Sequence, residues 1–131
     1  MAKNKTHYVD GFVLVIKKKN VAAYQKMARD GAKMWMKYGA LSYKECIGDD
    51  LHPNTGGYPI FYFPKMAKLK AGETVWFSYI EYKSKKHRDQ VNKKVMADMA
   101  KYQKEHPDHT QEMPFDMKRM AVGGFKVMVS N

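Results

Sequence analysis

Apolar residues fall on both alternating faces of residues 8–16, which predicts a strand covered on both sides. In an extended chain, Leu14 and Ile16 lie on one face and Val13 and Val15 on the other. A strand of this kind belongs in the middle of a covered sheet. Residues 74–82 are rich in large side chains on both faces as well, so we predict a second central strand there.

Two amphipathic helices separate the predicted strands. The first follows Asn20, a residue that favours the N-cap, and ends at Gly39, while the second follows Ser84. In both, apolar residues recur at spacings of three and four. Residues 40–48 alternate with only partial apolar character, which is typical of an edge strand. The last strand is predicted at 118–129, where two adjacent glycines indicate a bulge or a close backbone approach.

The order strand, helix, strand, strand, helix, strand predicts an α+β, ferredoxin-like βαββαβ fold. Its four-stranded antiparallel sheet has the order 4-1-3-2, which places the two doubly apolar strands in the centre. The 131 residues form one domain, 1–131, with residues 1–6 flexible and 51–72 a long loop. The aromatic stretch 61–63 within that loop is interpreted as a lid or subunit contact, or as a loop tucked against the sheet. Two helices cover only one sheet face, so a second copy is the simplest cover for the other.

The chain is strongly basic, with 24 Lys and Arg against 13 Asp and Glu and a net charge of +11. This balance favours contact with anions. The basic residues around the start of the second helix form a candidate anion site, with a solvated basic turn as the alternative: Lys83, Lys85, Lys86 and Arg88. The sequence holds one cysteine and no apolar run of signal-peptide or membrane-spanning length, from which we expect a cytoplasmic protein with no membrane partner.

Polar residues in otherwise apolar surroundings define a candidate cleft between helices and sheet. Asp10 lies in a doubly covered strand, where a carboxylate needs a partner, and Arg119 on the predicted neighbouring strand is the expected one. Such a pair either belongs to a site or is a purely structural ion pair. The candidate cleft residues, with the tryptophans as apolar walls, are Asp10, Trp35, Trp76, His87, Arg88 and Arg119.

The spacing of His106 and His109 around Asp108 superficially resembles a metal site. A third spaced ligand is missing, so no metal and no cofactor are predicted. The chain also has no nucleophile triad, phosphate-cradling glycine loop or pair of catalytic carboxylates. The sequence therefore leaves open whether the protein is an enzyme.

Several polar and glycine-containing motifs, spread over nearly the whole chain, resemble the YbaA-like family. It is a bacterial family of unknown function, number 1428 in the series of domains of unknown function. The resemblance implies a dimeric α/β barrel and supplies no reaction. The chain departs from the family at 51–64, which is longer, and around 100–112. The motifs are Tyr8-Val9-Asp10-Gly11-Phe12, Glu45-Cys46-Ile47-Gly48-Asp49-Asp50, Tyr82-Lys83-Ser84 with His87-Arg88-Asp89, and Met113-Pro114-Phe115-Asp116 with Gly123-Gly124-Phe125.

Three functions fit these residues. The first is a homodimeric cytoplasmic protein that binds or acts on a small molecule in the cleft, as proteins of similar architecture do. The second is a basic module that binds nucleic acid or another polyanion, although residues 74–82 lack the aromatic-glycine signature of RNA-binding sheets. The third is a regulatory or stress-related dimer without catalysis.

Overall fold

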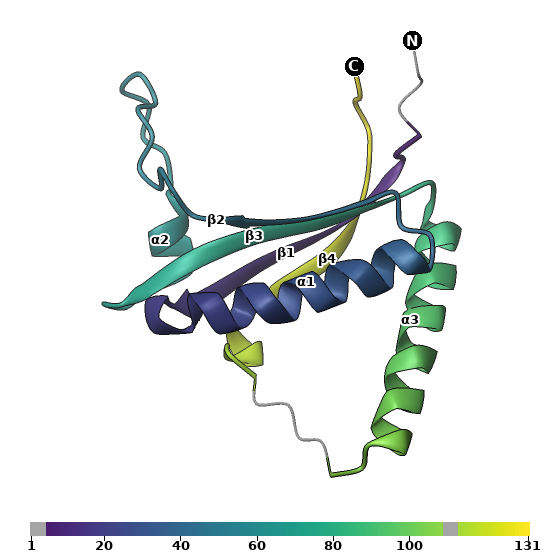
Figure 1. Cartoon of the computed structure of the whole chain (residues 1–131). Helices are drawn as coiled ribbons and strands as arrows, with labels where there is room; N and C mark the ends of the chain where they lie inside the picture. Colours follow the sequence, from purple (N-terminus) through teal and green to yellow (C-terminus); the bar gives the residue numbers. More distant parts are fainter. Residues whose placement is uncertain (1–4, 109–112) are drawn as a thin grey trace.

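The computed structural model describes residues 5–108 and 113–131. One sheet forms its centre, and α1 and α3 lie on the same side of it (Figure 1). The elements in chain order are β1 (Tyr8–Lys17), η1 (Lys18–Asn20), α1 (Val21–Lys37), β2 (Ser42–Ile47), α2 (Phe63–Met66), β3 (Glu73–Tyr82), α3 (Lys85–Glu105), η2 (Met117–Arg119) and β4 (Ala121–Lys126).

The sheet has four antiparallel strands in the order β2-β3-β1-β4, which is the predicted 4-1-3-2 order read from the opposite edge. The two doubly apolar strands are the central ones, and they pair from Tyr8 opposite Tyr82 to Lys17 opposite Glu73. The α+β fold with its antiparallel sheet is therefore confirmed.

The last strand is shorter than predicted, because residues 117–119 form the 3₁₀ turn η2 and pairing with β1 begins at Ala121. The register of β1 with β4 is regular, so the predicted bulge at the paired glycines is wrong. The close approach at Gly124 comes from a side chain and not from another backbone, since a Cβ atom there would collide with the Tyr8 phenol. Glycine leaves room for the Tyr8 ring in its present position.

Helix ends follow the sequence signals with one exception. The Ser84 Oγ accepts a hydrogen bond of 3.0 Å from the His87 backbone N–H, so it caps α3 as predicted. Gly39, just beyond α1, has φ +105°, which only glycine adopts without strain. Asn20 precedes α1 but its side chain does not cap the helix; its amide donates to the Pro114 carbonyl oxygen at 3.3 Å.

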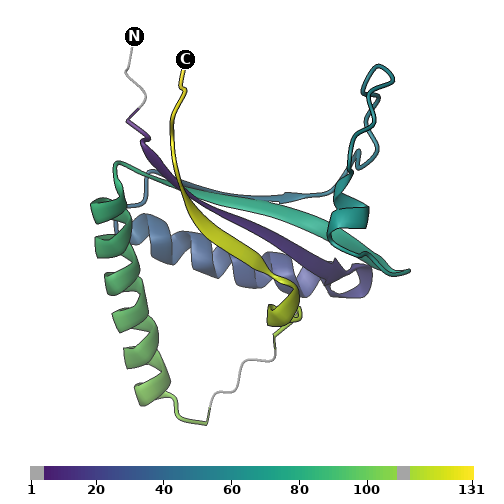
Figure 2. The same ribbon diagram turned by 180° about the vertical axis from the view of Figure 1, so that it is seen from behind.

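The sheet buries one face against the helices and leaves much of the other bare. Side chains of β1 and β3 on the helix face make two core clusters, one under α1 and one under α3. Figure 2 gives the same arrangement from behind. The first cluster is Leu14, Ile16, Tyr24, Ala28 and Trp76, and the second is Ala40, Ile80, Tyr82, Val91 and Val95.

On the opposite face, α2 lies at one end (Figure 1). Phe77 and Phe125, which alternate with residues of the helix face, are 45% and 61% exposed. The sheet therefore presents aromatic side chains to solvent on the side away from α1 and α3.

Residues 49–62, here called the arm, project away from the sheet before the chain enters α2 (Figure 1). Tyr58 and Phe61 are 74% and 64% exposed. Hydrogen bonds within the arm stabilise its conformation; for example, Tyr62 Oη donates to the Pro53 carbonyl oxygen at 3.1 Å. The interpretation of this loop as tucked against the sheet is therefore wrong for residues 49–62, and the lid or subunit contact stays a prediction.

Among the described residues, no helix combines the length and the apolar character that crossing a membrane requires.

Candidate functional site

A cavity of about 860 Å³ lies between the helices and the sheet. Apolar and aromatic side chains from α1, α3, the sheet and the segment before β4 make most of its wall. This volume is within the range of small-molecule sites, roughly 300–1,000 Å³. Its lining includes Phe12, Leu14, Met27, Met34, Trp35, Met99, Tyr102, Phe115 and Met120, with Tyr24, Tyr43, Glu45 and Ser78 as a polar group.

The polar group centres on the Glu45 carboxylate. Tyr43 Oη donates to Glu45 Oε1 at 2.8 Å, and Tyr24 Oη lies 3.1 and 3.0 Å from the two carboxylate oxygens. Ser78 Oγ donates a short hydrogen bond to Glu45 Oε2. Three hydroxyl groups thus converge on one acidic side chain at the cavity wall.

The β2–β3 register brings this group together. Glu45 on β2 lies opposite Ser78 on β3, and Tyr43, two residues before Glu45, points to the same face. Helix α1 crosses that face and supplies Tyr24. Burial raises the pKa of both Tyr24 and Tyr43 above the ordinary tyrosine value, and the neighbouring Glu45 charge adds to the rise. Both phenols therefore remain protonated donors at neutral pH.

Sequence reasoning missed Glu45 as a site residue. The signal was present, because Glu45 alternates with Tyr43 and Ile47 on the more apolar side of an edge strand. A carboxylate in that row has to find polar partners from elsewhere in the fold. The identity of those partners depends on the register and on α1, neither of which the local pattern defines.

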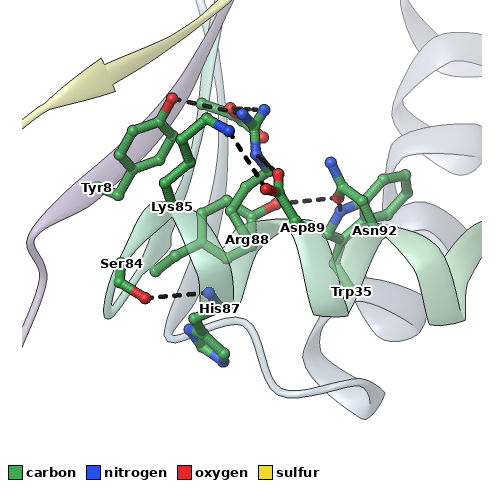
Figure 3. Close-up of polar contacts among 10 residues, drawn as sticks. Tyr8, Trp35, Ser84, Lys85, His87, Arg88, Asp89 and Asn92 are labelled. Atoms are coloured by element: carbon green, nitrogen blue, oxygen red, sulfur yellow. Dashed lines mark hydrogen bonds and ion pairs between the residues drawn. The ribbon is translucent and has the colours of Figure 1, made fainter.

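A second polar cluster lies at the start of α3 and contains the predicted cleft residues Asp10 and Arg88 (Figure 3). Arg88 Nη1 is 2.9 Å from Asp10 Oδ1, and the Arg88 guanidinium also lies 2.8 Å from Asp89 and over the Tyr8 ring. The Asp10 side chain is only 6% exposed. Burial raises the pKa of Asp10, and the Arg88 charge and hydrogen bonds from Tyr82, Arg88 and Asn92 offset the rise in part.

The predicted pairing of Asp10 with Arg119 is wrong. Arg119 lies in η2 rather than in the strand beside β1, and its Nη1 donates to Glu73 Oε2 at 2.6 Å. Its Nη2 also donates to the Lys68 carbonyl oxygen at 2.9 Å, so Arg119 closes the turn before β3. Its guanidinium keeps the pKa of Glu73 below the ordinary value.

The remaining predicted cleft residues are placed separately. Trp35 is part of the cavity wall, and its Nε1 donates to Asn92 Oδ1 at 3.0 Å. Trp76 packs edge-on against Tyr24, with ring centroids 4.8 Å apart, in the core behind the wall. His87 lies at the α3 start, where its Nδ1 accepts from the Lys83 backbone N–H at 3.0 Å (Figure 3).

The basic turn before and within α3 is already partly neutralised by the protein. Lys85 pairs with Asp89 at 3.4 Å, and Arg88 is turned toward Asp10 and Asp89. The predicted anion site, with Lys83 and Lys86, stays a prediction.

Within residues 5–108 and 113–131, no group of three or more His, Cys, Asp or Glu side chains is arranged to hold a metal ion. Of the two histidines considered as metal ligands, His109 lies outside the described residues.

These features define an α+β protein with a four-stranded antiparallel sheet and a cavity between that sheet and its helices. Residues 7–117 match the family described as "Protein of unknown function (DUF1428)", and the chain belongs to this family. It is 36% identical over 122 residues to "Uncharacterized protein YbaA" of Escherichia coli (strain K12), covering 93% of this chain and 97% of that protein. The protein of the same name from Shigella flexneri gives the same identity and coverage.

Proposed function

We propose that this protein is a homodimer that binds a small organic molecule in the cavity between its helices and its sheet. The observation that carries the proposal is the cavity itself, about 860 Å³ with a mainly apolar wall and a polar group around Glu45. Ligand sites combine these properties, because the apolar wall contributes affinity and a few fixed polar atoms orient the ligand. The wall also contains four methionines, which adapt to ligands of different shape: Met27, Met34, Met99 and Met120.

A matched pair of tryptophan variants on α3 tests ligand binding. Met99 is part of the cavity wall, whereas Met96 on the same helix is 65% exposed and outside it. Nile red is a neutral dye whose emission rises in apolar surroundings, so it reports on the cavity without bias for charge. We expect its emission to rise with the wild-type protein and with Met96→Trp and to fall sharply with Met99→Trp. Equal dye uptake by both variants would contradict the proposal.

The homodimer part of the proposal rests on the bare sheet face. Phe77 and Phe125 are largely exposed there, and Val13 and Tyr79 share the same face. A second copy packed on this face by a two-fold axis would cover the same residues in both subunits. The exposed arm, residues 49–62, lies away from the cavity wall and is available for the same contact.

The mass in solution tests the dimer. Light scattering after gel filtration should give twice the chain mass of 15.2 kDa. Phe77→Glu places a charge in the proposed interface and should give a monomer, while Met96→Glu, on exposed α3 surface, should leave the dimer intact. A wild-type monomer would refute the sheet-to-sheet dimer.

A cytoplasmic location is part of the proposal as well, because the one cysteine, Cys46, is exposed and the sequence has no second cysteine for an internal disulfide.

One observation favours a second candidate function. The exposed Phe77 and the half-buried Tyr79 alternate on a central strand of a protein with net charge +11, and bases of single-stranded nucleic acid stack on aromatic side chains at such positions. Dimerisation through this face would block the platform. A monomer that retains single-stranded RNA on a filter at low salt, and loses it with Phe77→Ala, would assign the face to nucleic acid instead.

A further inference from the structure

The polar group of the cavity has an unusual composition, because one carboxylate is surrounded by hydroxyl groups alone. Glu45 accepts hydrogen bonds from Tyr24, Tyr43 and Ser78. Three donors directed at one carboxyl group are the partners of its ionised form. Among the ion pairs of the described residues, none involves Glu45. The negative charge therefore has hydrogen bonds but no cation of its own.

A ligand beside Glu45 would contact hydrogen-bond acceptors. A tyrosine or serine hydroxyl has one proton and two lone pairs, and each of the three hydroxyls already gives its proton to Glu45. Because the phenols of Tyr24 and Tyr43 stay protonated, they do not become additional charges. What remains toward the cavity is a set of acceptors: lone pairs on the hydroxyls and the unfilled capacity of the carboxylate. A ligand group without donors would leave all of them unsatisfied.

The surroundings of the carboxylate favour a positive charge in addition to a donor. Aromatic rings from β1, α1, β2, α3 and the segment before η2 line the cavity, and the ring centroid of Trp35 lies 6.1 Å from that of Tyr43. The faces of such rings attract cations. The other charged side chains of the wall, Lys26 and Asp30, are one basic and one acidic residue on α1, so they add no net charge. The cavity is therefore acidic at Glu45 even though the whole chain is strongly basic.

We propose that the cavity selects an organic cation: an amine whose protonated nitrogen pairs with Glu45 and donates to the surrounding hydroxyl oxygens, with an apolar body against the aromatic and methionine wall. This inference rests on the proposed function, since it names the chemical class of ligand for the same cavity. It makes Glu45 the residue that determines specificity. The positive charge on the protein surface does not contribute to this selectivity.

Three probes with one apolar body and different end groups test the inference. Phenylbutylamine, phenylbutanol and phenylbutyrate are titrated into the wild-type protein by calorimetry. We expect the amine to bind about tenfold more tightly than the alcohol, as one charge-assisted hydrogen bond would give, and the carboxylate to bind most weakly. Equal affinity for amine and alcohol would overturn the inference. This comparison needs no variant, so it stands even if a substitution prevents folding.

A charge-removing variant assigns the effect to its residue. Glu45→Gln keeps the shape of the side chain and should lower amine affinity about tenfold while leaving alcohol affinity unchanged. Glu105→Gln removes the same charge from the exposed end of α3 and should change neither. An amine preference that survives in Glu45→Gln would refute the role of this residue.

The two proposals fail in different ways. If Nile red distinguishes Met99→Trp from Met96→Trp but the amine has no advantage over the alcohol, the cation selection is wrong and the cavity remains a ligand site. If Nile red does not distinguish the two variants, the proposed function itself is refuted.

Discussion

Replacing Arg88 by methionine tests the most deeply buried ion pair among the described residues. The Asp10 side chain is 6% exposed and that of Arg88 is 20% exposed, with 2.9 Å between the paired atoms. Methionine retains much of the apolar stem of arginine and removes the charge. The variant therefore leaves a buried carboxylate without its cation.

The expected cost follows from the geometry. Removing one partner of a buried pair costs about 3–5 kcal/mol. Here the partial exposure of Arg88 and the polar groups of Tyr82 and Asn92 beside Asp10 reduce that figure. We expect the free energy of unfolding to fall by about 2–4 kcal/mol near pH 7, which lowers Tm by roughly 10 °C for a chain of this size.

The pH dependence has a defined sign. The pKa of Asp10 in the folded protein is already raised by burial, and loss of the Arg88 charge raises it further. A carboxyl group whose folded pKa exceeds its unfolded value destabilises the protein as pH rises toward the folded pKa. The difference in free energy of unfolding between wild type and Arg88→Met should therefore narrow as pH falls. The narrowing begins at the Asp10 pKa of the variant and ends at the lower Asp10 pKa of the wild type.

Urea unfolding at matched protein concentration, near pH 7 and at about pH 5, measures both effects. Asp89→Asn is the control, because Asp89 is the exposed partner of Arg88 and its loss should cost less than about 1 kcal/mol. Adding Asp10→Asn to Arg88→Met should restore part of the lost stability, since no charge then remains buried. A double variant less stable than Arg88→Met alone, or a difference that widens on acidification, would refute the reasoning.

Three further substitutions have expected outcomes in urea or thermal unfolding. Arg119→Gln should lower the free energy of unfolding at neutral pH, because Arg119 lowers the pKa of Glu73. The difference from wild type should shrink as pH falls below 4.5, the ordinary pKa of that carboxyl group, and a difference that stays constant with pH would contradict this. Gly124→Ala should cost about 1–3 kcal/mol, since the new Cβ collides with the Tyr8 phenol, and Tyr8→Ala in the same chain should remove most of the added cost. Gly39→Ala should cost about 1–2 kcal/mol because of its φ of +105°, whereas Gly39→Asn should cost less.

The sheet order could be predicted from the sequence because apolar residues on both faces of a strand can be seen in the local sequence, and they identify that strand as a central one. Residues 8–16 and 74–82 carry large apolar side chains on both faces, which favours the central positions of the sheet, and the structure places both strands there. The start of α3 could be predicted for a similar reason, since Ser84 caps its own helix within three residues. These features depend on chemistry that is contained within one element.

The partner of Asp10 could not be predicted because it depends on where an element ends. Residues 118–129 were expected to place Arg119 beside β1, but the chain turns through η2 first and Arg119 meets Glu73 instead. Asp10 is then reached by Arg88, 78 residues away on α3. Glu45 has the same difficulty, since its three donors come from α1, β2 and β3. Local periodicity contains no information about contacts between side chains that are distant in sequence.

Trp35 connects the polar cluster around Asp10 and Arg88 with the polar group around Glu45. This link gives Asp10 and Arg88 a positioning role instead of the predicted place in the cleft. Its Nε1 donates to Asn92 on α3, and the Asn92 oxygen also accepts from Tyr82 Oη at 3.4 Å, within the cluster of Asp10 and Arg88. Its ring faces Tyr43, whose hydroxyl donates to Glu45. The ion pair thus fixes α3 on the sheet and, through Asn92, the orientation of one cavity wall. On this argument Arg88 and Asp10 are positioning residues outside the cavity, and Glu45 is the acidic group that a ligand would meet.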